Sequence, residues 1–311
     1  MRPVHPRVEP RWDVVGIGAV SVDMVSVVPA FPRPEGWLSK LRVARRLVSC
    51  GGQTATAMAA CARFGLRARY VGAVGDDDNG RRILSELPGY GLDASAVVVR
   101  PGRSQSAVII IDERTGERAV LWDRDDTVTV GPIDVPLDLV ASARLVHVDD
   151  VDQETAIGAA QGARSLGIPV TSDLDRMTAR TEELVRAVSC AIFAEGLPEQ
   201  LTGESDHERA FRRLRQRHDG LFVVTLGRDG AAALDGDRFV RSAGFPVEAV
   251  DTTGSGDVFR AGFIYGLLAG WPLDRTLRLA NAAAALSCTR LGAMAGIPGL
   301  AESLALAERR G

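Results

Sequence analysis

Three small residues followed by an acid, Gly254, Ser255, Gly256 and Asp257, carry the clearest chemical signal in this sequence. Residues 245–250 before them alternate like a strand end, and the apolar residues after them recur with helical spacing. The backbone N–H groups at a helix start lack intrahelical partners and lie at the positive end of the helix dipole, so glycines there let an anion approach closely. A carboxylate beside that anion suggests a proton acceptor for a hydroxyl group.

A purely structural explanation of the same residues is also open. Thr252, Thr253 and Asp257 are residue types that cap the first turn of a helix. The whole segment Asp251-Thr-Thr-Gly-Ser-Gly-Asp, however, resembles the C-terminal signature D-T-x-G-[AS]-G-D of the ribokinase-like (PfkB) carbohydrate kinases. This resemblance implies phosphoryl transfer from ATP to a sugar hydroxyl, with Asp257 as general base and the three residues before it as anion hole.

Two segments in the N-terminal half resemble the substrate-binding parts of the same family. An acid stands at position 23, where the family's first strand ends in a residue that binds sugar hydroxyls. Residues 50–60 resemble the signature G-G-x-x-x-N before an Ala-rich helix, with Thr where Asn is frequent, although a plain strand–turn–helix joint would look similar. The substrate-binding residues implied are Asp23, Gly51, Gly52, Gln53, Thr56, Gln105, Arg124 and Asp150.

A different cofactor is suggested, weakly, by Gly16-x-Gly18 after the first predicted strand, which could be taken for a dinucleotide fingerprint. That fingerprint needs a helix next, but residues 24–28 are mostly β-branched and predict a strand. The sequence therefore disfavours a nicotinamide cofactor.

The nucleotide side of the resemblance lies in the C-terminal half. Residues 225–230 resemble the turn T-x-G-x-x-G that borders the nucleotide, and residues 281–293 resemble the segment that lines the adenine. The nucleotide-binding residues implied are Thr225, Gly227, Gly230 and Asn281.

Two cations follow from the resemblance. Mg²⁺ is expected on ATP, held mainly by phosphates and water. The family's N-x-x-E metal motif is degraded, since Ala194 and Leu197 occupy its ends, which leaves Glu195 to order that water. A K⁺ site beside the anion hole is implied at Asp251, Thr253 and Ala293.

Within the family, the sulfofructose kinase branch is the most similar. Residues 104–107, 193–197 and 288–292 resemble that branch. Its sulfonate-binding Arg is expected just after the central strand, where this chain has Val151, and an Asn expected on the lid aligns with Trp122. These departures predict a relative that uses a different sugar.

The predicted fold is α/β. From Leu145 onward strands alternate with helices, which predicts a mainly parallel sheet covered on both faces. Residues 105–122 form a predicted hairpin that, with strands within 24–50, makes a small sheet. The resemblance implies a ribokinase-like three-layer αβα sandwich in which that small sheet is a lid over the sugar. We expect a flexible tail over 1–12, the kinase domain over 13–300, and a C-terminal helix or tail over 301–311.

Composition excludes several other classes. A net charge of −3 leaves no basic stripe for nucleic acid, and no apolar run is long enough to span a membrane. The four cysteines are widely spaced, as expected of buried thiols in a cytoplasmic protein. Residues 76–78 are acidic, but loop and helix-cap roles explain them better than a metal site.

Two rival functions stay open at this point. A nucleoside kinase of the same family would use the same base and stack a purine on Trp37 or Trp122. A catalytically silent sugar-binding module would keep the fold but would need no base, so Asp257 argues against it. An exposed lid sheet also hints at a homodimer.

Overall fold

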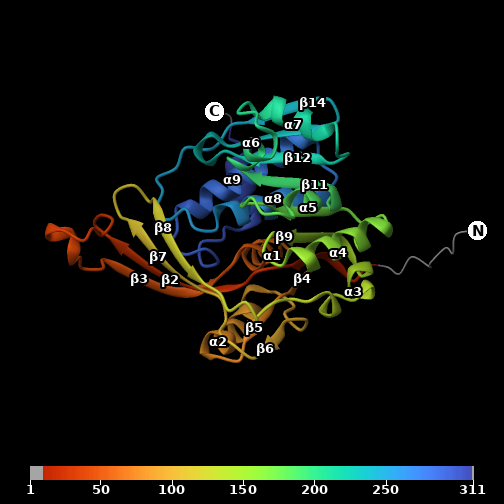
Figure 1. The fold of residues 1–311 in the computed structure, drawn as a ribbon. Helices are drawn as coiled ribbons and strands as arrows, with labels where there is room; N and C mark the ends of the chain where they lie inside the picture. Colours follow the sequence, from red (N-terminus) through yellow and green to blue (C-terminus); the bar gives the residue numbers. More distant parts are fainter. Residues whose placement is uncertain (1–9, 310–311) are drawn as a thin grey trace, which may run out of the picture.

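The central sheet forms because its strands are apolar on both faces, as parallel sheets covered by helices require. In β1 (Trp12–Ile17), Val14 and Val15 are both fully buried and belong to hydrophobic clusters on opposite faces. The computed structural model describes residues 10–309 and shows helices on both sides of this sheet (Figure 1). The predicted three-layer α/β fold is confirmed.

Within residues 10–309 the main sheet has eight strands, in the order β14-β13-β12-β11-β10-β9-β1-β4. The strands from β12 to β4 pair in parallel, whereas β13 and β14 add an antiparallel hairpin at one edge. This hairpin, which turns at Gly236 with φ +57°, goes beyond the prediction. The strands after β1 are β4 (Ala68–Val71), β9 (Ala143–Asp149), β10 (Val170–Asp173), β11 (Cys190–Ala194), β12 (Leu221–Thr225), β13 (Ala231–Asp235) and β14 (Arg238–Ser242).

Helices cover the two faces of the sheet with separate hydrophobic clusters. One face carries α1 (Gln53–Arg63), α8 (Ser255–Leu268) and α9 (Leu273–Cys288), with α10 (Leu300–Ala307) packed on α9. The other carries α3 (Leu137–Ala141), α4 (Gln153–Ser165), α5 (Thr181–Ala187), α6 (Leu197–Thr202) and α7 (His207–Arg215). A smaller layer holds β5 (Ala73–Gly75), β6 (Val98–Arg100) and α2 (Asp78–Glu86).

The second sheet, the lid, projects from the core on the left of Figure 1. Its order is β3-β2-β7-β8, built from β2 (Ser21–Val28), β3 (Arg45–Gly51), β7 (Ser106–Asp112) and β8 (Arg118–Asp123). The lid segments are as predicted, with two corrections. Strand β2 begins at Ser21, and residues 31–44 are not strand, because Pro32 and Pro34 cannot donate to a ladder and a short 3₁₀ helix, Gly36–Ser39, follows.

The domain limits also shift slightly. Trp12 is the first residue of β1 and pairs with Ala143, so the predicted tail over 1–12 is one residue too long; residues 1–9 lie outside the described part. At the other end, α10 continues to Ala307 and belongs to the packed core.

Cys50, Cys61, Cys190 and Cys288 are all free thiols. Among residues 10–309, none of the helices is long and apolar enough to cross a membrane.

Candidate active site

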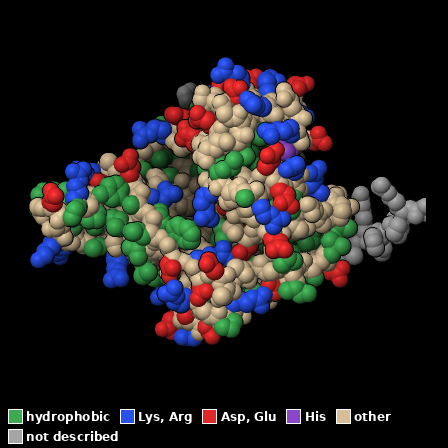
Figure 2. Space-filling model, in the orientation of Figure 1, with side chains coloured by type: hydrophobic (Ala, Val, Ile, Leu, Met, Phe, Trp, Pro, Cys, Tyr) green, Lys and Arg blue, Asp and Glu red, His purple; other side chains and the backbone are tan. Residues whose placement is uncertain are grey.

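A cleft of about 750 Å³ lies between the lid and the carboxyl ends of the parallel strands. Open α/β sheets bind ligands at this edge. Figure 2 shows the hollow between lid and core, with basic side chains at its walls. The lining residues that matter below are Asp23, Gly52, Gln53, Gln105, Arg118, Trp122, Arg124, Val151, Asp173, Asp175, Arg176, Thr225, Thr253, Gly254, Ser255, Gly256, Asp257, Arg260 and Ala293.

Helix α8 begins at the floor of this cleft with an N-terminus that no side chain of the described chain caps. Gly254 is its N-cap residue, with φ +76°, and a Cβ added there would lie 2.8 Å from the Cβ of Ala293. Only glycine tolerates this position. The hydroxyl of Thr253 is buried without a hydrogen-bond partner in residues 10–309, and the Ser255 N–H reaches the Thr252 carbonyl at 3.3 Å. The capping explanation therefore fails, and the helix start remains suited to an anion.

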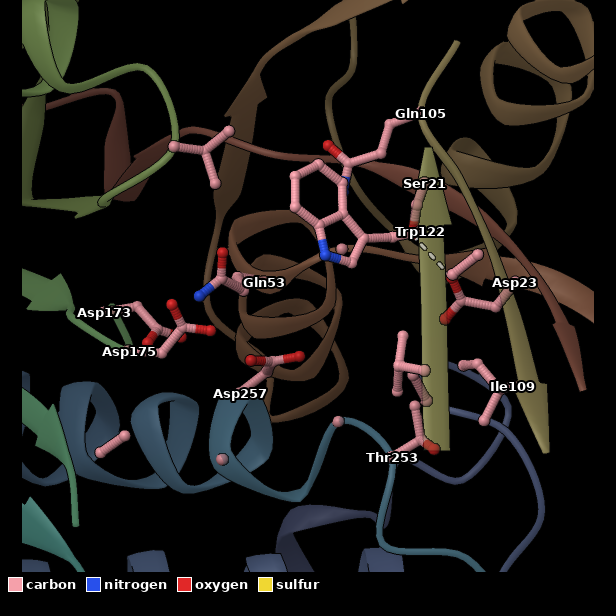
Figure 3. A pocket seen from close by; sticks show the side chains of 18 of the residues that line it. Ser21, Asp23, Gln53, Gln105, Ile109, Trp122, Asp173, Asp175, Thr253 and Asp257 are labelled. Carbon is pink, nitrogen blue, oxygen red and sulfur yellow. Dashed lines mark hydrogen bonds between the residues drawn. The ribbon is translucent and has the colours of Figure 1, made fainter. Parts of the chain in front are cut away.

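Asp257 stands in the first turn of α8 and faces the cleft (Figure 3). Burial raises its pKa to about 7, against the opposing effect of the nearby guanidinium groups of Arg260 and Arg118. A carboxylate with a pKa near neutrality suits proton transfer at physiological pH. Figure 3 shows Asp173 and Asp175, from the end of β10 and the loop after it, directed toward the same part of the cleft.

Arg260 lies one turn further along α8 and makes a buried ion pair with Asp173, with Nη2 and Oδ1 2.5 Å apart. Both side chains are almost fully buried, at 4% and 2% exposure. The guanidinium bends back toward the helix start, because a Cβ added at Gly256 would lie 2.8 Å from Arg260 Nη1. The pair therefore sits directly beneath the anion hole.

The lid supplies the opposite wall. Asp23 on β2 is buried and accepts a hydrogen bond from Ser21 Oγ at 2.7 Å, and burial raises its pKa to about 6. Gly52, with φ +93°, leads into α1, where a Cβ would approach the Val20 Cα within 2.5 Å. Gln53 and Gln105 also line the cleft. Of the other predicted contacts, Gly51 and Thr56 are buried below the surface of the cleft and do not line it.

Two predicted substrate contacts have other partners. Asp150 does not line the cleft; its Oδ2 accepts the N–H groups of Asp175 and Arg176, both at 3.0 Å, and so shapes the loop after β10. Arg124 does line the cleft, but its Nη2 donates to Asp152 Oδ1 at 2.5 Å and to the Val128 carbonyl. Both side chains form hydrogen bonds with other protein groups, and these contacts could not be predicted from the sequence.

The loop shaped by Asp150 carries Arg176 into the cleft. Its guanidinium lies 5.3 Å from the ring centroid of Trp122 on β8, a cation–π contact that joins core and lid. Arg176 Nε also contacts Asp175 Oδ1 at 3.2 Å. Trp37, the other predicted stacking residue, is 70% exposed and does not line the cleft.

The predicted nucleotide residues are only partly brought together. Thr225 lines the cleft at the end of β12, and Gly227 and Gly230 shape the turn after it, with φ +53° and +93°. Asn281 does not line the cleft, because its amide nitrogen donates to Ser242 and to the Ala243 carbonyl and ties α9 to the edge hairpin. The contact of Asn281 with the nucleotide stays a prediction.

Of the residues predicted to bind cations, some lie beside the start of α8 and one lies outside the cleft. Both carboxylate oxygens of Asp251 accept backbone N–H groups at 2.8 Å, from Thr253 and from Gly292, and so join the loop before α8 to the one that contains Ala293. Glu195 is exposed and outside the cleft lining, so it gains no support as an organiser of Mg²⁺-bound water. Among the described residues no group of three or more His, Cys, Asp or Glu side chains could hold a metal ion by itself.

The sequence did not predict several cleft residues, among them Arg118, Asp173, Arg176 and Arg260. Asp173 ends a buried strand and Arg176 follows it, at the carboxyl edge of the sheet where ligands bind, and that signal could have found them. Arg260 interrupts the apolar residues of α8, and a lone charge in such a helix predicts a buried partner.

Comparisons with known proteins agree with this geometry. A model of the pfkB family carbohydrate kinases matches residues 12–299. An ATP-dependent ribose-1-phosphate kinase from Halopiger xanaduensis is 32% identical over 298 residues, which cover 95% of this chain and 98% of that protein. A nucleoside kinase from Methanothermobacter thermautotrophicus is 27% identical over 305 residues, 94% of each chain. The solved structure of a candidate ribokinase from Agrobacterium tumefaciens superposes with a TM-score of 0.86 at 32% identity, over 95% of this chain and 97% of that one. The chain belongs to the pfkB family of carbohydrate kinases, and its fold is ribokinase-like.

Proposed function

We propose that this protein transfers the γ-phosphoryl group of ATP to a hydroxymethyl group of a sugar or sugar derivative. The observation that carries the proposal is the position of Asp257, which lies in the cleft beside a helix N-terminus that no side chain in residues 10–309 caps. A sugar held between Asp257, the lid residue Asp23 and Gln53 at the start of α1 would present a hydroxyl to the carboxylate and to the anion hole together.

In the proposed step, the hydroxymethyl oxygen forms a bond to the γ-phosphorus, and the bond from that phosphorus to the β–γ bridging oxygen breaks. The electron pair of the broken bond leaves with ADP, and the hydroxyl proton passes to Asp257. The N–H groups of Gly254, Ser255 and Gly256 stabilise the negative charge on the phosphoryl oxygens. Because the transition state is loose, positioning and charge neutralisation supply most of the catalysis.

The substitution Asp257→Asn tests the assignment. The variant should fold and bind ATP but lose turnover by about 10²–10⁴-fold, the usual value of a general base. Asp126→Asn makes the same chemical change at an exposed position of the same cleft and is the matched control. Near wild-type turnover in Asp257→Asn would refute the base. A wild-type protein that binds sugar but transfers no phosphate would support the silent sugar-binding module instead.

The acceptor is the finer part of the proposal. Relatives of this chain are named for ribose 1-phosphate, ribose, 5-dehydro-2-deoxygluconate and nucleosides. We place ribose and ribose 1-phosphate first, because the relative named for ribose 1-phosphate and the candidate ribokinase are each 32% identical to this chain. Comparing kcat/KM for these compounds and for sugar acids, at saturating Mg-ATP, will identify the preferred class.

A nucleoside acceptor is the second candidate. The ring of Trp122 is 57% exposed and lines the cleft, where it could stack on a base. If nucleosides are the acceptors, Trp122→Ala should raise their KM, whereas it should change the KM of ribose much less. Equal effects on both acceptors would remove the stacking argument.

Cations and assembly complete the proposal. Mg²⁺ bound by the ATP phosphates would neutralise charge that develops during transfer. K⁺ would bind near Asp251, Thr253 and Ala293, where the loops on either side of the anion hole meet.

A homodimer would form through the lid, whose outer face exposes the cross-strand pair Val108 and Leu121. Leu121→Glu, read by light scattering, should then yield monomers.

A further inference from the structure

The buried ion pair beneath the anion hole has no place in the chemistry described so far. Asp173 Oδ1 and Arg260 Nη2 are 2.5 Å apart, and neither side chain is more than 4% exposed. Burying two charges is costly unless they serve each other, so an isolated pair of this kind calls for a reason. The position of the pair suggests that reason. Arg260 lies three residues after Asp257 on α8, and residues at that spacing share one face of a helix, so the pair lies next to the proposed base.

The carboxyl groups of Asp173 and Asp257 converge on the same part of the cleft (Figure 3). They are close enough to influence each other's ionisation in two opposite ways. A protonated Asp173 would donate a hydrogen bond to Asp257 and lower its pKa, whereas an ionised Asp173 would repel a second negative charge and raise it. The state of Asp173 therefore decides how strong a base Asp257 is.

Arg260 favours the ionised state. A guanidinium stays protonated in proteins, so a neutral Asp173 would leave a buried cation without a counter-ion. Asp173 is the one carboxylate with which Arg260 forms an ion pair among residues 10–309, and Arg260 Nε has no hydrogen-bond partner there. Burial raises the pKa of Asp173 well above its usual value, and the ion pair with Arg260, at 2.5 Å, acts in the opposite direction by favouring the charged carboxylate.

We propose that Asp173, held ionised by Arg260, is a positioning residue that keeps Asp257 a strong enough base and thereby sets the lower pH limit of catalysis. The inference rests on the proposed function, in which Asp257 must be deprotonated to accept the hydroxyl proton. Among residues 10–309, the other charged groups that most affect the two carboxylates are Arg260 from α8, Asp175 from the loop after β10, Asp150 directly after β9 and Arg118 from β8.

The test is the pH profile of kcat/KM for the acceptor at saturating Mg-ATP. In the wild-type protein the acidic limb should have its midpoint near pH 7, where burial and the neighbouring charges bring the pKa of Asp257. Removing the negative charge with Asp173→Asn should move the midpoint about 1–2 units lower, because a neighbouring like charge raises a pKa by about that much. Asp173→Glu, which keeps the charge, should restore the midpoint.

The control and the contrary outcomes are equally specific. Asp126→Asn removes an exposed carboxylate of the same cleft, where solvent screens its charge, so its midpoint should match the wild type and reveal any titration of ATP itself. An unchanged or raised midpoint in folded Asp173→Asn would overturn the proposal. So would a wild-type midpoint below pH 5, which requires no variant to fold.

Turnover is not the only readout. The carboxyl ¹³C shift of Asp257, assigned with Asp257→Asn in aspartate-labelled protein, should titrate near pH 7 and move lower in Asp173→Asn. If no acceptor is phosphorylated but the titration of Asp257 moves lower in Asp173→Asn, the kinase assignment is wrong and the interaction between the two carboxylates is supported. If phosphorylation occurs and the Asp257 titration ignores Asp173, the pair has failed and the kinase stands.

Discussion

Arg118 on the lid strand β8 donates two hydrogen bonds to Thr252, in the loop that leads into the anion hole. Its Nη1 lies 2.7 Å from the Thr252 hydroxyl and 3.0 Å from the Thr252 carbonyl oxygen. These residues are 134 positions apart in sequence. The contact connects the lid to the backbone proposed to hold the phosphate.

Breaking this contact should impair catalysis more than stability. Arg118→Gln removes the charged donor that holds Thr252, and because misplacing a catalytic site by about 1 Å can cost about 10²-fold, kcat should fall by about 10–100-fold. Stability should change by less than about 1 kcal/mol, since the side chain is exposed. Arg103→Gln is the control, because Arg103 contacts Asp123 at the lid but does not line the cleft. Equal losses of kcat in both variants would mean that Arg118 acts only through the positive charge that it adds to the lid, and not through its contact with Thr252.

The monovalent cation gives a second prediction. Asp251 joins the loop before α8 to Gly292, so a cation bound there would order the Gly254–Gly256 amides. Activity should be higher in K⁺ than in Na⁺, because the larger ion is easier to dehydrate. Initial rates in the two chlorides at matched ionic strength measure the effect, and Asp251→Asn should remove it. Identical rates in wild-type protein would rule out the site.

A third prediction concerns sulfonated sugars. Val151 lines the cleft where the sulfofructose kinase branch is expected to have its sulfonate-binding Arg. Without that cation, 6-sulfonated fructose should be a poor acceptor relative to uncharged sugars. Val151→Arg should improve its kcat/KM. Efficient phosphorylation of the sulfonated sugar by the wild-type protein at micromolar concentration would show that another group, such as Arg176, supplies the charge.

The lid gives the fourth prediction. Four strands cannot bury much apolar surface alone, and Val120 and Trp122 on the inner side are 45% and 57% exposed. Sugar binding should therefore close the lid and slow amide hydrogen exchange in β7 and β8 more than in α8. Trp122→Leu, which loses the cation–π contact with Arg176, should weaken this protection. Exchange in the lid that ignores bound sugar would show a rigid lid.

Much of this architecture could be predicted from local patterns. Strand and helix periodicity predicted the parallel sheet, since each β-branched run must be buried between helices. The hairpin over 105–122 and the start of α8 were predicted from turn residues and from the spacing of apolar positions. Where local signals were interrupted, as by Pro32 and Pro34, the extent of a strand was predicted wrongly.

Short-range order in the sequence also determined the proposed reactive centre: Gly254, Ser255, Gly256 and Asp257 are contiguous, so one helix start brings a carboxylate and backbone N–H groups together. Tertiary structure alone decided what surrounds them. Asp173 and Arg260 meet because strand β10 ends beside α8, and the side chains of Asp150, Arg124 and Asn281 form hydrogen bonds with protein groups that the sequence did not predict. Hydrogen bonds and ion pairs between residues far apart in sequence form only once packing has fixed their distances, and no spacing along the chain encodes those distances.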